Sequence, residues 1–428
     1  MSFNSNDFIK DLLNLTDEYL LFSGNISTEI VSKSKTKVFD AVLTYDAKVC
    51  PCCGNIEKGT IIKHGNKYSI ARILPVNGMP AAIRIKKQRF LCKECEHTFI
   101  AETNLVKKYN SISKPLKFKI LETISQKISE KDIAKLNNIS HSTVSKYIDS
   151  GFSSYIPKRD YLPKNLSFDE FKSTKDATGS MSFIMTDLDK RKIIDIVENR
   201  QLRDLKKYFY SFDKKARLSV ESVTIDMYSP YITLIKEVLP NANIIFDRFH
   251  IINNLARALI KTRIEEMKTF STQSYEYKRL KKYWKMLQIP SEDLDSIHFK
   301  KWIHFKEWKS AKTLVNDTLS ASTTLKNTYE VYQILLYDIK NKDHIGLKRH
   351  LERFFDSPSE YMQTAMKTLT ENYEYVENAL KYNYSNGFTE GTNNFIKVLK
   401  RIAFGYRSFF HFRNRILITC SLKRILDN

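Results

Sequence analysis

The sequence contains no long hydrophobic run. A membrane-spanning helix needs about 18 or more consecutive apolar residues, and no stretch of the 428 residues approaches that length. The first residues, MSFNSNDFIKDLL, also lack the charged and then apolar layout of a signal peptide. We therefore expect a cytoplasmic protein with no membrane partner.

Acidic residues are few relative to basic ones. Asp and Glu number 48 against 70 Lys and Arg, which gives a formal net charge of +22 and an isoelectric point near 9.5. The basic excess is spread along the whole chain, which indicates a polyanionic partner, most simply nucleic acid. A membrane surface is the competing partner, but the chain has no lipidation motif and no long basic amphipathic segment.

Cysteine is also scarce, and five of the six cysteines lie between residues 50 and 95. This distribution argues against a disulfide scaffold and for a metal site. Two C-x-x-C pairs, the spacing of a tetrahedral structural Zn²⁺ site, are formed by Cys50, Cys53, Cys92 and Cys95. Cys52 is an alternative to Cys50 or Cys53 as a ligand, and His97 is an alternative to Cys95. Four reduced thiols without metal are the other interpretation.

The first 105 residues divide into two predicted parts. Residues 1–36 combine a short helix (Asp7 to Leu15) with a polar connection, and residues 37–105 form a small zinc-ribbon-like module. Within that module, residues 81–90 alternate between apolar and basic side chains, as a half-exposed strand does. That strand offers three cations to phosphate groups: Arg84, Lys86 and Arg89.

Residues 106–150 have the pattern of a helix-turn-helix. Ser129 and Asp132 form an N-terminal capping pattern. Asn138 suits a left-handed turn position, and Ser140 caps a second helix. The outward face of that helix carries side chains suited to base edges and phosphates: His141, Ser142, Thr143, Ser145 and Lys146. An ordinary helical hairpin is the alternative.

After a linker at 151–165, residues 166–261 mix strands and helices. Strands are expected at 166–171, 180–185, 192–197, 223–225 and 244–246. Helices follow the third and the fourth strand. This order is that of the ribonuclease H-like fold, a mixed sheet whose first and fourth strands are parallel neighbours. Asp169 on the first strand and Asp226 at the end of the fourth then lie side by side.

Residues 222–250 form a strand–helix–strand crossover, which makes the two strands parallel. Ser229 occupies the N-cap position of the helix, with Pro230 at its first position. The strands end in Asp226 and Asp247, and the carboxyl ends of parallel strands are where open α/β sheets bind ligands. An Asp that only caps the next turn is the alternative at each position.

Residues 262–375 are rich in Lys and Tyr and show no strand alternation. This pattern predicts an all-helical insertion. It also holds every tryptophan of the chain: Trp284, Trp302 and Trp308. We expect these side chains in the core of the insertion, and a stacking platform for bases is the alternative.

Residues 376–428 complete the predicted catalytic core and add basic C-terminal helices. A small and polar segment contains Glu390, with Thr389 as a cap, and an amphipathic helix follows from Phe395 to Ile402. The basic residues here alternate with aromatic ones, which suits either a grip on a DNA strand or a packed terminal helix pair. The candidate DNA contacts are Lys397, Lys400, Arg401 and Arg407.

The predicted fold brings Asp169, Asp226 and Glu390 together. Clustered carboxylates repel one another and need protons or cations, and oxygen ligands of this kind suit Mg²⁺ or Mn²⁺. Two such ions support the attack of water or a 3′-hydroxyl on phosphorus. We therefore expect metal-dependent chemistry on the strands of DNA.

Several motifs of the sequence resemble those of DDE-type transposases of bacterial insertion sequences, in the family named IS-L-three. The motifs are CPCCG with RFLCKEC, the helix-turn-helix, SFDEF, TIDMYSPY, NANIIFDRFHI and GFTEGTNNFIKVLKRIAFGYR. The resemblance covers essentially the whole chain. It implies catalytic acids at Asp169, Asp226 and Glu390, and an amino-terminal region that binds terminal inverted repeats. It further implies a nucleoid-associated enzyme on double-stranded DNA, active as a homodimer or larger assembly.

Asp247 and His250 form a D-x-x-H motif, and related transposase groups carry a similar pair. Asp247 is a candidate metal contact and His250 a candidate contact of the scissile phosphate. A structural pair at a helix start is the alternative. At the level of function, the alternatives are a non-catalytic DNA-binding regulator and a nuclease that cuts without joining.

Overall fold

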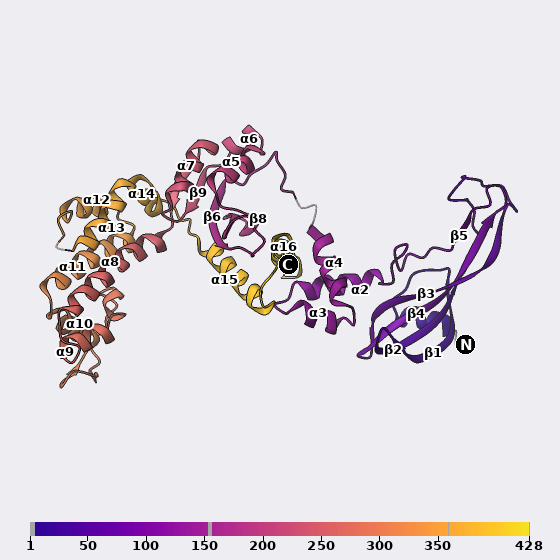
Figure 1. Ribbon diagram of the computed structural model, residues 1–428, viewed down its shortest axis with the longest axis horizontal. Coiled ribbons are helices and arrows are strands. Elements are labelled where there is room, and N and C mark those ends of the chain that lie inside the picture. The colour runs from indigo at the N-terminus through magenta and orange to yellow at the C-terminus, as the bar shows by residue number, and fades with distance from the viewer. Residues whose placement is uncertain (1–4, 153–155, 358, 428) are drawn as a thin grey trace. The chain divides into compact units, whose positions relative to one another are not determined.

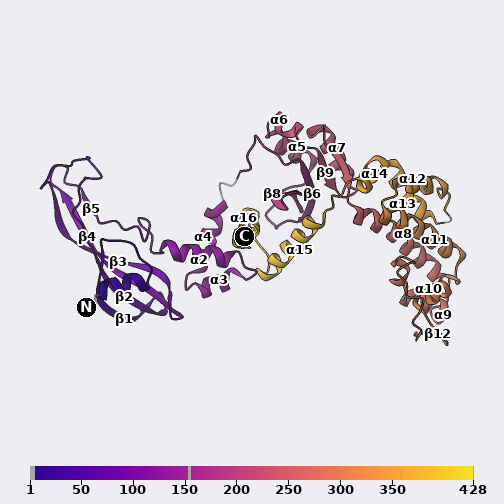
Figure 2. The ribbon, with the colours of Figure 1, turned by 180° about the vertical axis from the view of Figure 1, so that it is seen from behind.

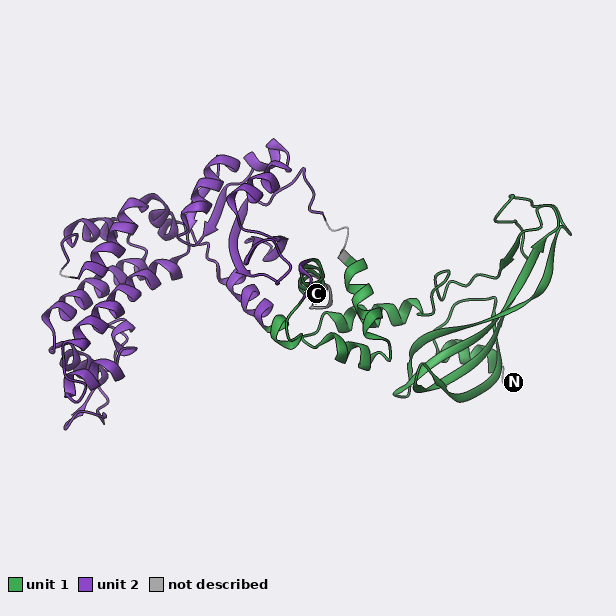
Figure 3. Ribbon diagram, viewed as in Figure 1, with its two compact units in different colours: residues 1–155, 398–406, 410–428 green, residues 156–397, 407–409 purple. Residues whose placement is uncertain are grey.

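The computed structural model describes residues 5–152, 156–357 and 359–427 (Figure 1). The chain forms two compact units, which Figure 3 distinguishes by colour. The first unit contains residues 1–155, 398–406 and 410–428, and the second contains residues 156–397 and 407–409. The boundary near residue 155 falls within the predicted linker 151–165, of which residues 153–155 lie outside the described part.

A mixed five-stranded sheet forms most of the first unit. Its strand order is β1-β2-β4-β3, with β5 paired to β4. The strands are β1 (Leu20–Val31), β2 (Ser34–Leu43), β3 (Ile61–Val76), β4 (Met79–Cys92) and β5 (Thr98–Ile100). The predicted alternation is present in β4, where Ile83 and Ile85 are buried and the basic side chains that follow them, Arg84 and Lys86, are half-buried. Helix α1 (Ser5–Leu12) contributes Ile9 to the same core.

The interpretation of residues 1–36 as a helix and a polar connection was wrong for its second half. Residues 20–31 form β1, which pairs antiparallel with β2. The two strands meet at Ser32 and Lys33, whose φ angles are 51° and 70°. A two-residue hairpin turn with positive φ at both positions usually carries Asn-Gly or Asp-Gly. Ser-Lys gives no such signal, and β1 is mostly exposed, so its pattern does not stand out from a loop.

Helices α2 (Lys114–Ile124), α3 (Glu130–Leu136) and α4 (His141–Phe152) follow the sheet. Two predicted caps are confirmed: Ser129 Oγ accepts the N–H of Asp132 at 3.1 Å, and Ser140 Oγ accepts the N–H of Thr143 at 3.2 Å. Asn138 has the predicted positive φ, at 49°. The buried side chains of this group also include one from α16 (Phe409–Asp427): Leu116, Ile120, Ile124, Ile133, Ala134, Val144, Ile148 and Ile418. The C-terminal helix is therefore part of the same core.

The second unit is built on a sheet with strand order β10-β9-β6-β7-β8. The strands are β6 (Asn165–Lys172), β7 (Met181–Asp187), β8 (Lys192–Val197), β9 (Ser222–Ile225) and β10 (Asn243–Phe246). β6, β7 and β8 pair antiparallel, whereas β9 pairs parallel with both β6 and β10. The prediction that the first and fourth strands are parallel neighbours is thus confirmed.

Helices α5 (Leu202–Tyr210) and α7 (Ser229–Val238) pack together against this sheet, with α6 (Lys214–Leu218) close by (Figures 1 and 2). The apolar stripe predicted for α7 is buried. The predicted N-cap was one residue off, because Tyr228 is the N-cap and Ser229 is already helical. The chain leaves β9 in a tight turn, closed by the N–H of Tyr228 on the carbonyl of Asp226 at 2.7 Å, and this turn fixes where the helix begins.

The region predicted as an all-helical insertion is mainly helical. Its helices are α8 (Arg248–Lys268), α9 (Tyr275–Lys282), the 3₁₀ helix η1 (Met286–Gln288), α10 (Ala311–Leu319), α11 (Thr323–Asn341), α12 (His344–Arg353), α13 (Glu360–Glu371) and α14 (Tyr373–Lys381). Two details differ from the prediction. α8 begins directly after β10, and a small hairpin is formed by β11 (Lys300–Lys301) and β12 (Trp308–Lys309). Strands of two residues are too short to show alternation.

The prediction that the tryptophans form the core of the insertion was wrong, although Trp302 is partly buried and packs against that core. None of the three is buried, and the side chain of Trp308 is 65% exposed. Apart from Phe305, the buried hydrophobic residues of this region are instead Leu, Ile, Val, Met, Ala and Tyr side chains, most of them from the helices. The cause is location, because Trp302 and Trp308 belong to the hairpin segment and not to a helix with a buried face.

Helix α15 (Gly387–Ile402) begins eight residues before the predicted start at Phe395. Its first two turns contain Gly, Thr and Asn, which have low helix propensity. Contacts to the sheet compensate: the Thr389 hydroxyl lies 2.8 Å from that of Ser167 and 2.9 Å from that of Thr186. Thr389 is therefore a buried helical residue and not the predicted cap. Among the described residues, no helix has both the length and the apolar character that a membrane crossing requires.

Candidate active site and metal centre

The four predicted cysteine ligands lie together at one end of the first sheet. Cys50 Sγ is 3.6 Å from Cys95 Sγ, and Cys53 Sγ is 3.8 Å from Cys92 Sγ. The four sulfur atoms all lie within 4.8 Å of one another. The two alternative ligands, Cys52 and His97, are outside this cluster, and Cys52 is exposed.

Tight turns hold both C-x-x-C pairs. The carbonyl of Cys50 accepts the N–H of Gly54 at 3.0 Å, and the N–H of Cys92 donates to the carbonyl of His97 at 3.0 Å. The backbone N–H of Cys53 points at the Cys50 thiol and lowers its pKa to about 6. Thiolate is the form that binds metal, so this turn prepares a ligand. Four sulfur donors at this separation fit a tetrahedral Zn²⁺ ion.

In the second unit, β6 and β9 bring Asp169 and Asp226 to the same end of the sheet. The last paired positions of these parallel strands are Ser167 and Thr224, and each acid lies two residues further along. Side chains two apart on a strand share a face, so Asp169 points to the same side as Ser167. Burial raises the pKa of Asp169 to about 7, and the negative charge of Asp226 acts in the same direction.

The face of β6 that carries Asp169 is covered by α15. Asn393 of α15 donates from Nδ2 to Asp169 Oδ2 at 2.7 Å and to the carbonyl of Glu170 at 3.2 Å. The opposite face carries Phe168, whose ring lies 5.3 Å from that of Phe209. The alternation of β6 therefore separates a polar layer under α15 from the apolar core under α5 and α7.

Asn386 forms a second link between the sheet and the start of α15. Its side chain is fully buried and accepts the hydroxyl of Ser167 at 2.6 Å. Its Nδ2 donates to Asp226 Oδ1 at 3.3 Å, and its backbone N–H donates to Asp247 Oδ1 at 3.1 Å. One residue thus fixes the positions of two acids that end neighbouring strands.

Glu390 lies in the first turn of α15, one turn from Asn386 and one turn from Asn393. It forms a group with Asp247 and His250 in which one ligand atom of each residue lies within 4.8 Å of the others. Burial raises the pKa of Glu390, and the charges of Asp247 and Asp226 raise it further. Glu390 therefore belongs to the same acidic cluster as the two strand-end acids.

His250 stands between two of these acids. Its Nδ1 lies 3.0 Å from Asp226 Oδ1 and 3.1 Å from Asp247 Oδ2. Contact with Asp226 and Asp247 raises the pKa of His250 to about 10, so the ring is an imidazolium at neutral pH. Burial alone would raise the pKa of Asp247, but the hydrogen bonds from His250 and from the Asn386 N–H outweigh it and lower that pKa.

The structure brings Glu390 together with the predicted D-x-x-H pair, and His250 also contacts Asp226. Asp169 lies outside this group: it is held by Asn393, one turn after Glu390 on α15, and it is near enough to Asp226 for that charge to raise its pKa. The donor set is oxygen-rich, which fits Mg²⁺ or Mn²⁺. A further observation agrees: Asn393 Oδ1 is buried and has no hydrogen-bond partner among the described residues.

Sequence reasoning missed Asn386 and Asn393. Asn386 lies four residues before Glu390 and Asn393 lies three residues after it. In a helix this spacing places all three side chains on one face. The signal was therefore present, but it could be read only if the helix was extended back to Gly387. The low helix propensity of this segment hid it.

Of the five DNA contacts predicted on α4, three side chains are exposed and two are half-buried with internal hydrogen bonds. His141, Ser142 and Lys146 are exposed. Ser145 is half-buried and donates to Glu130 Oε2 at 3.1 Å, and His141 Nε2 lies 3.6 Å from the same carboxylate. Thr143 is half-buried, with its hydroxyl 2.8 Å from that of Ser140.

The other predicted basic contacts differ in their surroundings. Arg84 is paired with Glu29 and lies 3.6 Å from Asp40, so nearby carboxylates already offset its charge. Lys86 is half-buried and Arg89 is exposed. In the C-terminal region Lys397, Arg401 and Arg407 are exposed, whereas Lys400 is half-buried with its Nζ 5.5 Å from the centre of the Phe412 ring.

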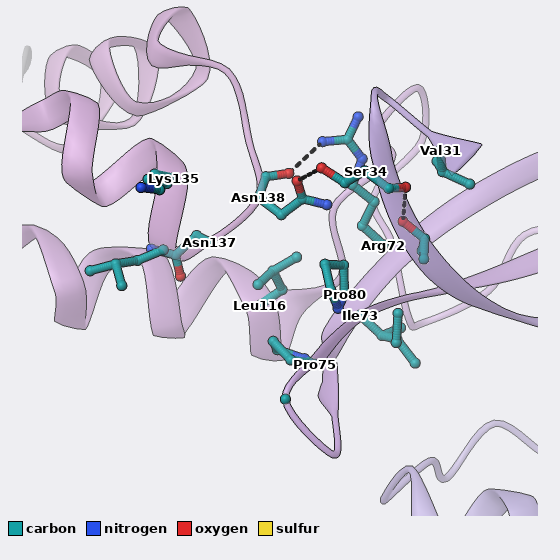
Figure 4. Close-up of a pocket in the computed structure, with 14 residues that line it drawn as sticks. Val31, Ser34, Arg72, Ile73, Pro75, Pro80, Leu116, Lys135, Asn137 and Asn138 are labelled. Atoms are coloured by element: carbon teal, nitrogen blue, oxygen red, sulfur yellow. Dashed lines mark hydrogen bonds between the residues drawn. The ribbon is translucent and has the colours of Figure 1, made fainter. Parts of the chain in front are cut away.

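A cavity of about 320 Å³ lies in the first unit, between the sheet and helices α2 and α3 (Figure 4). Two hydrogen bonds cross its edge to the predicted left-handed residue: Ser34 Oγ donates to Asn138 Oδ1 at 2.6 Å, and Arg72 Nη1 donates to the Asn138 carbonyl at 3.3 Å. The turn between α3 and α4 is therefore fixed to the sheet. The cavity is remote in sequence from the acidic cluster.

The sequence profile of the IS-L-three (ISL3) transposases matches residues 166–416, which is more than half of the chain and includes the whole acidic cluster. The chain belongs to the ISL3 family of transposases. A second profile, for the zinc finger of the transposases of IS204, IS1001, IS1096 and IS1165, matches residues 46–95 of this ISL3-family chain. That match includes all four clustered cysteines.

Individual relatives give a distant match and a partial one. The transposase of insertion element IS1001 from Bordetella parapertussis is 20% identical over 363 residues, covering 82% of this chain and 84% of that protein. A Lactococcus lactis subsp. lactis protein described as an ATP-dependent protease is 40% identical over 105 residues. That match covers 24% of this ISL3-family chain and only 34% of the Lactococcus protein. The sequence has no G-x-x-x-x-G-K-S or G-x-x-x-x-G-K-T motif for nucleotide phosphates.

Proposed function

We propose that the chain is a DNA transposase that binds the terminal inverted repeats of its insertion sequence and cleaves and joins DNA strands. The observation that carries this proposal is the cluster of acids from three distant parts of the sequence at one end of parallel strands β6 and β9. Membership of the ISL3 family supports the reaction class. The strand order of the second unit, with β9 parallel to β6, supports a ribonuclease H-like core.

In this proposal Asp169, Asp226 and Glu390 hold the catalytic cations. Bound Mg²⁺ or Mn²⁺ supplies activation of the attacking water or 3′-hydroxyl and stabilises the leaving oxygen. The remaining residues position the ligands. Asn393 orients Asp169, and Asn386 orients Asp226 and Asp247. Asp247 and His250 are secondary candidates, with the imidazolium partly neutralising the acids.

The amino-terminal half has a separate task in the proposal. Cys50, Cys53, Cys92 and Cys95 hold a structural Zn²⁺ ion that ties the strand ends of the first sheet together. Helices α3 and α4 act as a helix-turn-helix, with exposed His141, Ser142 and Lys146 towards double-stranded DNA. Since two element ends have to be joined in one reaction, a homodimer or larger assembly is the active form.

The test uses Asp226→Asn, which removes one charge but keeps the volume of the side chain. We expect this variant to bind an element end normally and to lose at least about a hundredfold in cleavage rate with Mg²⁺. The matched control is Asp160→Asn, an exposed carboxylate elsewhere in the second unit, which should keep full activity. The assays are a mobility shift for binding and a labelled duplex for nicked and joined products.

The same experiment separates the proposal from its neighbours. Full cleavage activity of Asp226→Asn contradicts the assignment of the acids. Cleavage without a joined product indicates a nuclease. End binding by the wild-type chain without any nicking, even in Mn²⁺, indicates a non-catalytic regulator.

A further inference from the structure

A basic surface lies in the helical region, at α9 and at the hairpin formed by β11 and β12. We call residues 275–285 and 296–309 the tip surface, which Figures 1 and 2 show beside α10. Four large apolar side chains in or just before the hairpin are exposed to solvent: Ile297 by 78%, Phe299 by 56%, Ile303 by 58% and Trp308 by 65%. Such a concentration of exposed apolar residues in 12 positions of a soluble fold marks an interaction site.

The tip surface is also strongly positive. Its two segments contain nine Lys or Arg residues and two Glu residues. Among the described residues, eight of these cations have no carboxylate within 4.0 Å, namely Lys278, Arg279, Lys281, Lys282, Lys285, Lys300, Lys301 and Lys306. The exception is Lys309, which pairs with Asp317 at 2.6 Å. Burial and the positive charges of Lys282 and Lys278 lower the pKa of His304, which shows the effect of this field on a neighbour.

The exposed side chains stand on a hydrogen-bonded base. Trp302 Nε1 donates to the carbonyl of Lys309 at 2.7 Å, which closes the hairpin. The Tyr283 hydroxyl donates to the carbonyl of Ile303 at 2.6 Å, and Arg279 Nε donates to the carbonyl of His304 at 2.9 Å. Buried Phe305 anchors the loop from below. The hairpin therefore presents Phe299 and Trp308 with their backbone already fixed, which lowers the entropic cost of binding.

We propose that the tip surface binds a single DNA strand, with the rings of Trp308 and Phe299 stacking on unpaired bases and Lys300, Lys301 and Lys306 contacting phosphates. The inference rests on the proposed function, because it takes DNA as the substrate. Aromatic rings stack on any base, and a basic surface follows the backbone. A second copy of the chain or an apolar protein partner would instead bury unpaired lysines, at a high desolvation cost. Fully paired duplex would use the charges but leave the rings without bases.

The test measures binding of the full-length chain to a fluorescent oligo-dT strand by anisotropy, without Mg²⁺ and with excess unlabelled duplex of unrelated sequence. The duplex occupies the modules that bind paired DNA. We expect Trp308→Ala to weaken binding of the single strand about tenfold. Reversal of two charges in Lys300→Glu/Lys301→Glu should weaken it further and reduce the salt dependence of the affinity.

Matched controls come from exposed residues elsewhere in the helical region. Tyr337→Ala removes an exposed ring from α11, and Lys268→Glu/Lys326→Glu reverses two exposed charges on α8 and α11. These variants should bind the strand within about twofold of the wild-type chain, well below the stacking effect of one ring. Photo-crosslinking with an iododeoxyuridine strand should attach it to Trp308 or Phe299.

Three outcomes decide the matter. Wild-type affinity of the tip variants, with no crosslink to the hairpin, overturns the inference. A tip variant that binds the strand normally but sediments as a smaller assembly shows an interface between copies, and this also overturns it. If the wild-type chain binds neither element ends nor any oligonucleotide, the proposed function itself fails. The two proposals fail separately, because the single-strand assay runs without Mg²⁺ and does not measure cleavage.

Discussion

Asn393 donates its side-chain amide to Asp169 Oδ2 at 2.7 Å, across 224 positions of sequence. The same amide reaches the carbonyl of Glu170 at 3.2 Å. Asn393 lies one turn after Glu390 on α15, so this contact sets the position of the helix that carries the third acid relative to the strand that carries the first. It thus links two catalytic candidates that are far apart in the sequence.

The first prediction concerns this contact. Asn393→Ala should lower the strand-cleavage rate by about 10- to 100-fold, the usual effect of removing a residue that orients a metal ligand. Binding of element ends should not change. Because the role is positional, the variant should also need a higher Mg²⁺ concentration for half-maximal cleavage, which a titration measures. The control is Asn394→Ala, which removes the same amide from the adjacent exposed position.

Equal Mg²⁺ dependence in Asn393→Ala and the wild-type chain would show that the residue only stabilises the fold. The melting temperature of the variant shows whether the substitution has destabilised the fold. A fall in activity with an unchanged Mg²⁺ requirement and a lower melting temperature counts against the positioning role.

The second prediction concerns the cysteine cluster. Cys53→Ser should abolish binding of one equivalent of zinc and unfold the end of the first sheet, because a structural zinc site contributes its binding free energy to folding. Cys52→Ser is the closest control, since Cys52 is the exposed neighbour outside the cluster. It should retain zinc and stability. Metal analysis of both purified variants makes the comparison, and zinc in Cys53→Ser would point to Cys52 as a substitute ligand.

Much of the second unit could be read from the sequence because its elements are buried on regular periods. The strand Ser222–Ile225 and the stripe of α7 are fully apolar where they face the core, and their positions follow from that pattern. The parallel pairing of β6 with β9 then placed Asp169 beside Asp226. Because the local hydrophobic pattern and the fold favour the same elements here, the parallel pairing of the first and fourth strands could be predicted.

Other parts could not be read because distant contacts decide them. The start of α15 has poor helix formers, and its helical form depends on buried hydrogen bonds: Ser167 donates to Asn386 Oδ1 and also bonds to the Thr389 hydroxyl. β1 is largely exposed, so it carries no apolar period. The tryptophans were placed in the core by their general tendency, but Trp308 lies in a hairpin too short to leave a pattern.

The third prediction concerns Arg415 of α16, whose side chain is fully buried. Its guanidinium donates to the carbonyl of Ile124, to that of Gln126 at 3.0 Å and to that of Ile128 at 3.1 Å. Arg415→Ala leaves these carbonyls without their donor and a fully buried site without its side chain, and it should cost about 3 kcal/mol of local stability. Hydrogen exchange should therefore speed up in α2 and α3.

An internal reference exists for this measurement. All three tryptophans lie in the second unit, so the unfolding transition seen by tryptophan fluorescence should not move in Arg415→Ala. Arg401→Ala, an exposed arginine of the first unit, is the control and should leave exchange in α2 and α3 unchanged. Unchanged exchange in Arg415→Ala would show that α16 is not needed to hold these helices.

The last prediction is a pH dependence of the same helical group. His411 of α16 lies 2.9 Å from Glu130 Oε1 through Nε2 and 2.6 Å from Asp149 Oδ1 through Nδ1. Burial acts to lower the pKa of His411, but the hydrogen bonds to Glu130 and Asp149 outweigh it, so the pKa lies above the ordinary 6.5. Burial acts to raise the pKa of Glu130, yet His411 lowers it below 4.5.

The sign of the effect follows from these directions. A histidine whose pKa is raised by folding contributes its full stability below the unfolded value near 6.5, and this contribution is lost as pH rises through the folded pKa. A glutamate whose pKa is lowered contributes above about 4.5 and loses its contribution as pH falls. The three-helix group with α16 should therefore be most stable between about pH 4.5 and 6.5.

His411→Gln should remove the loss of stability above this window, while His64→Gln, at an exposed position of the same unit, should keep it. Circular dichroism melts at pH 6 and pH 9 measure the difference, with tryptophan fluorescence of the second unit as the internal reference. An equal shift between the two pH values in wild type and His411→Gln would mean that other groups, and not this pair of ion contacts, set the response.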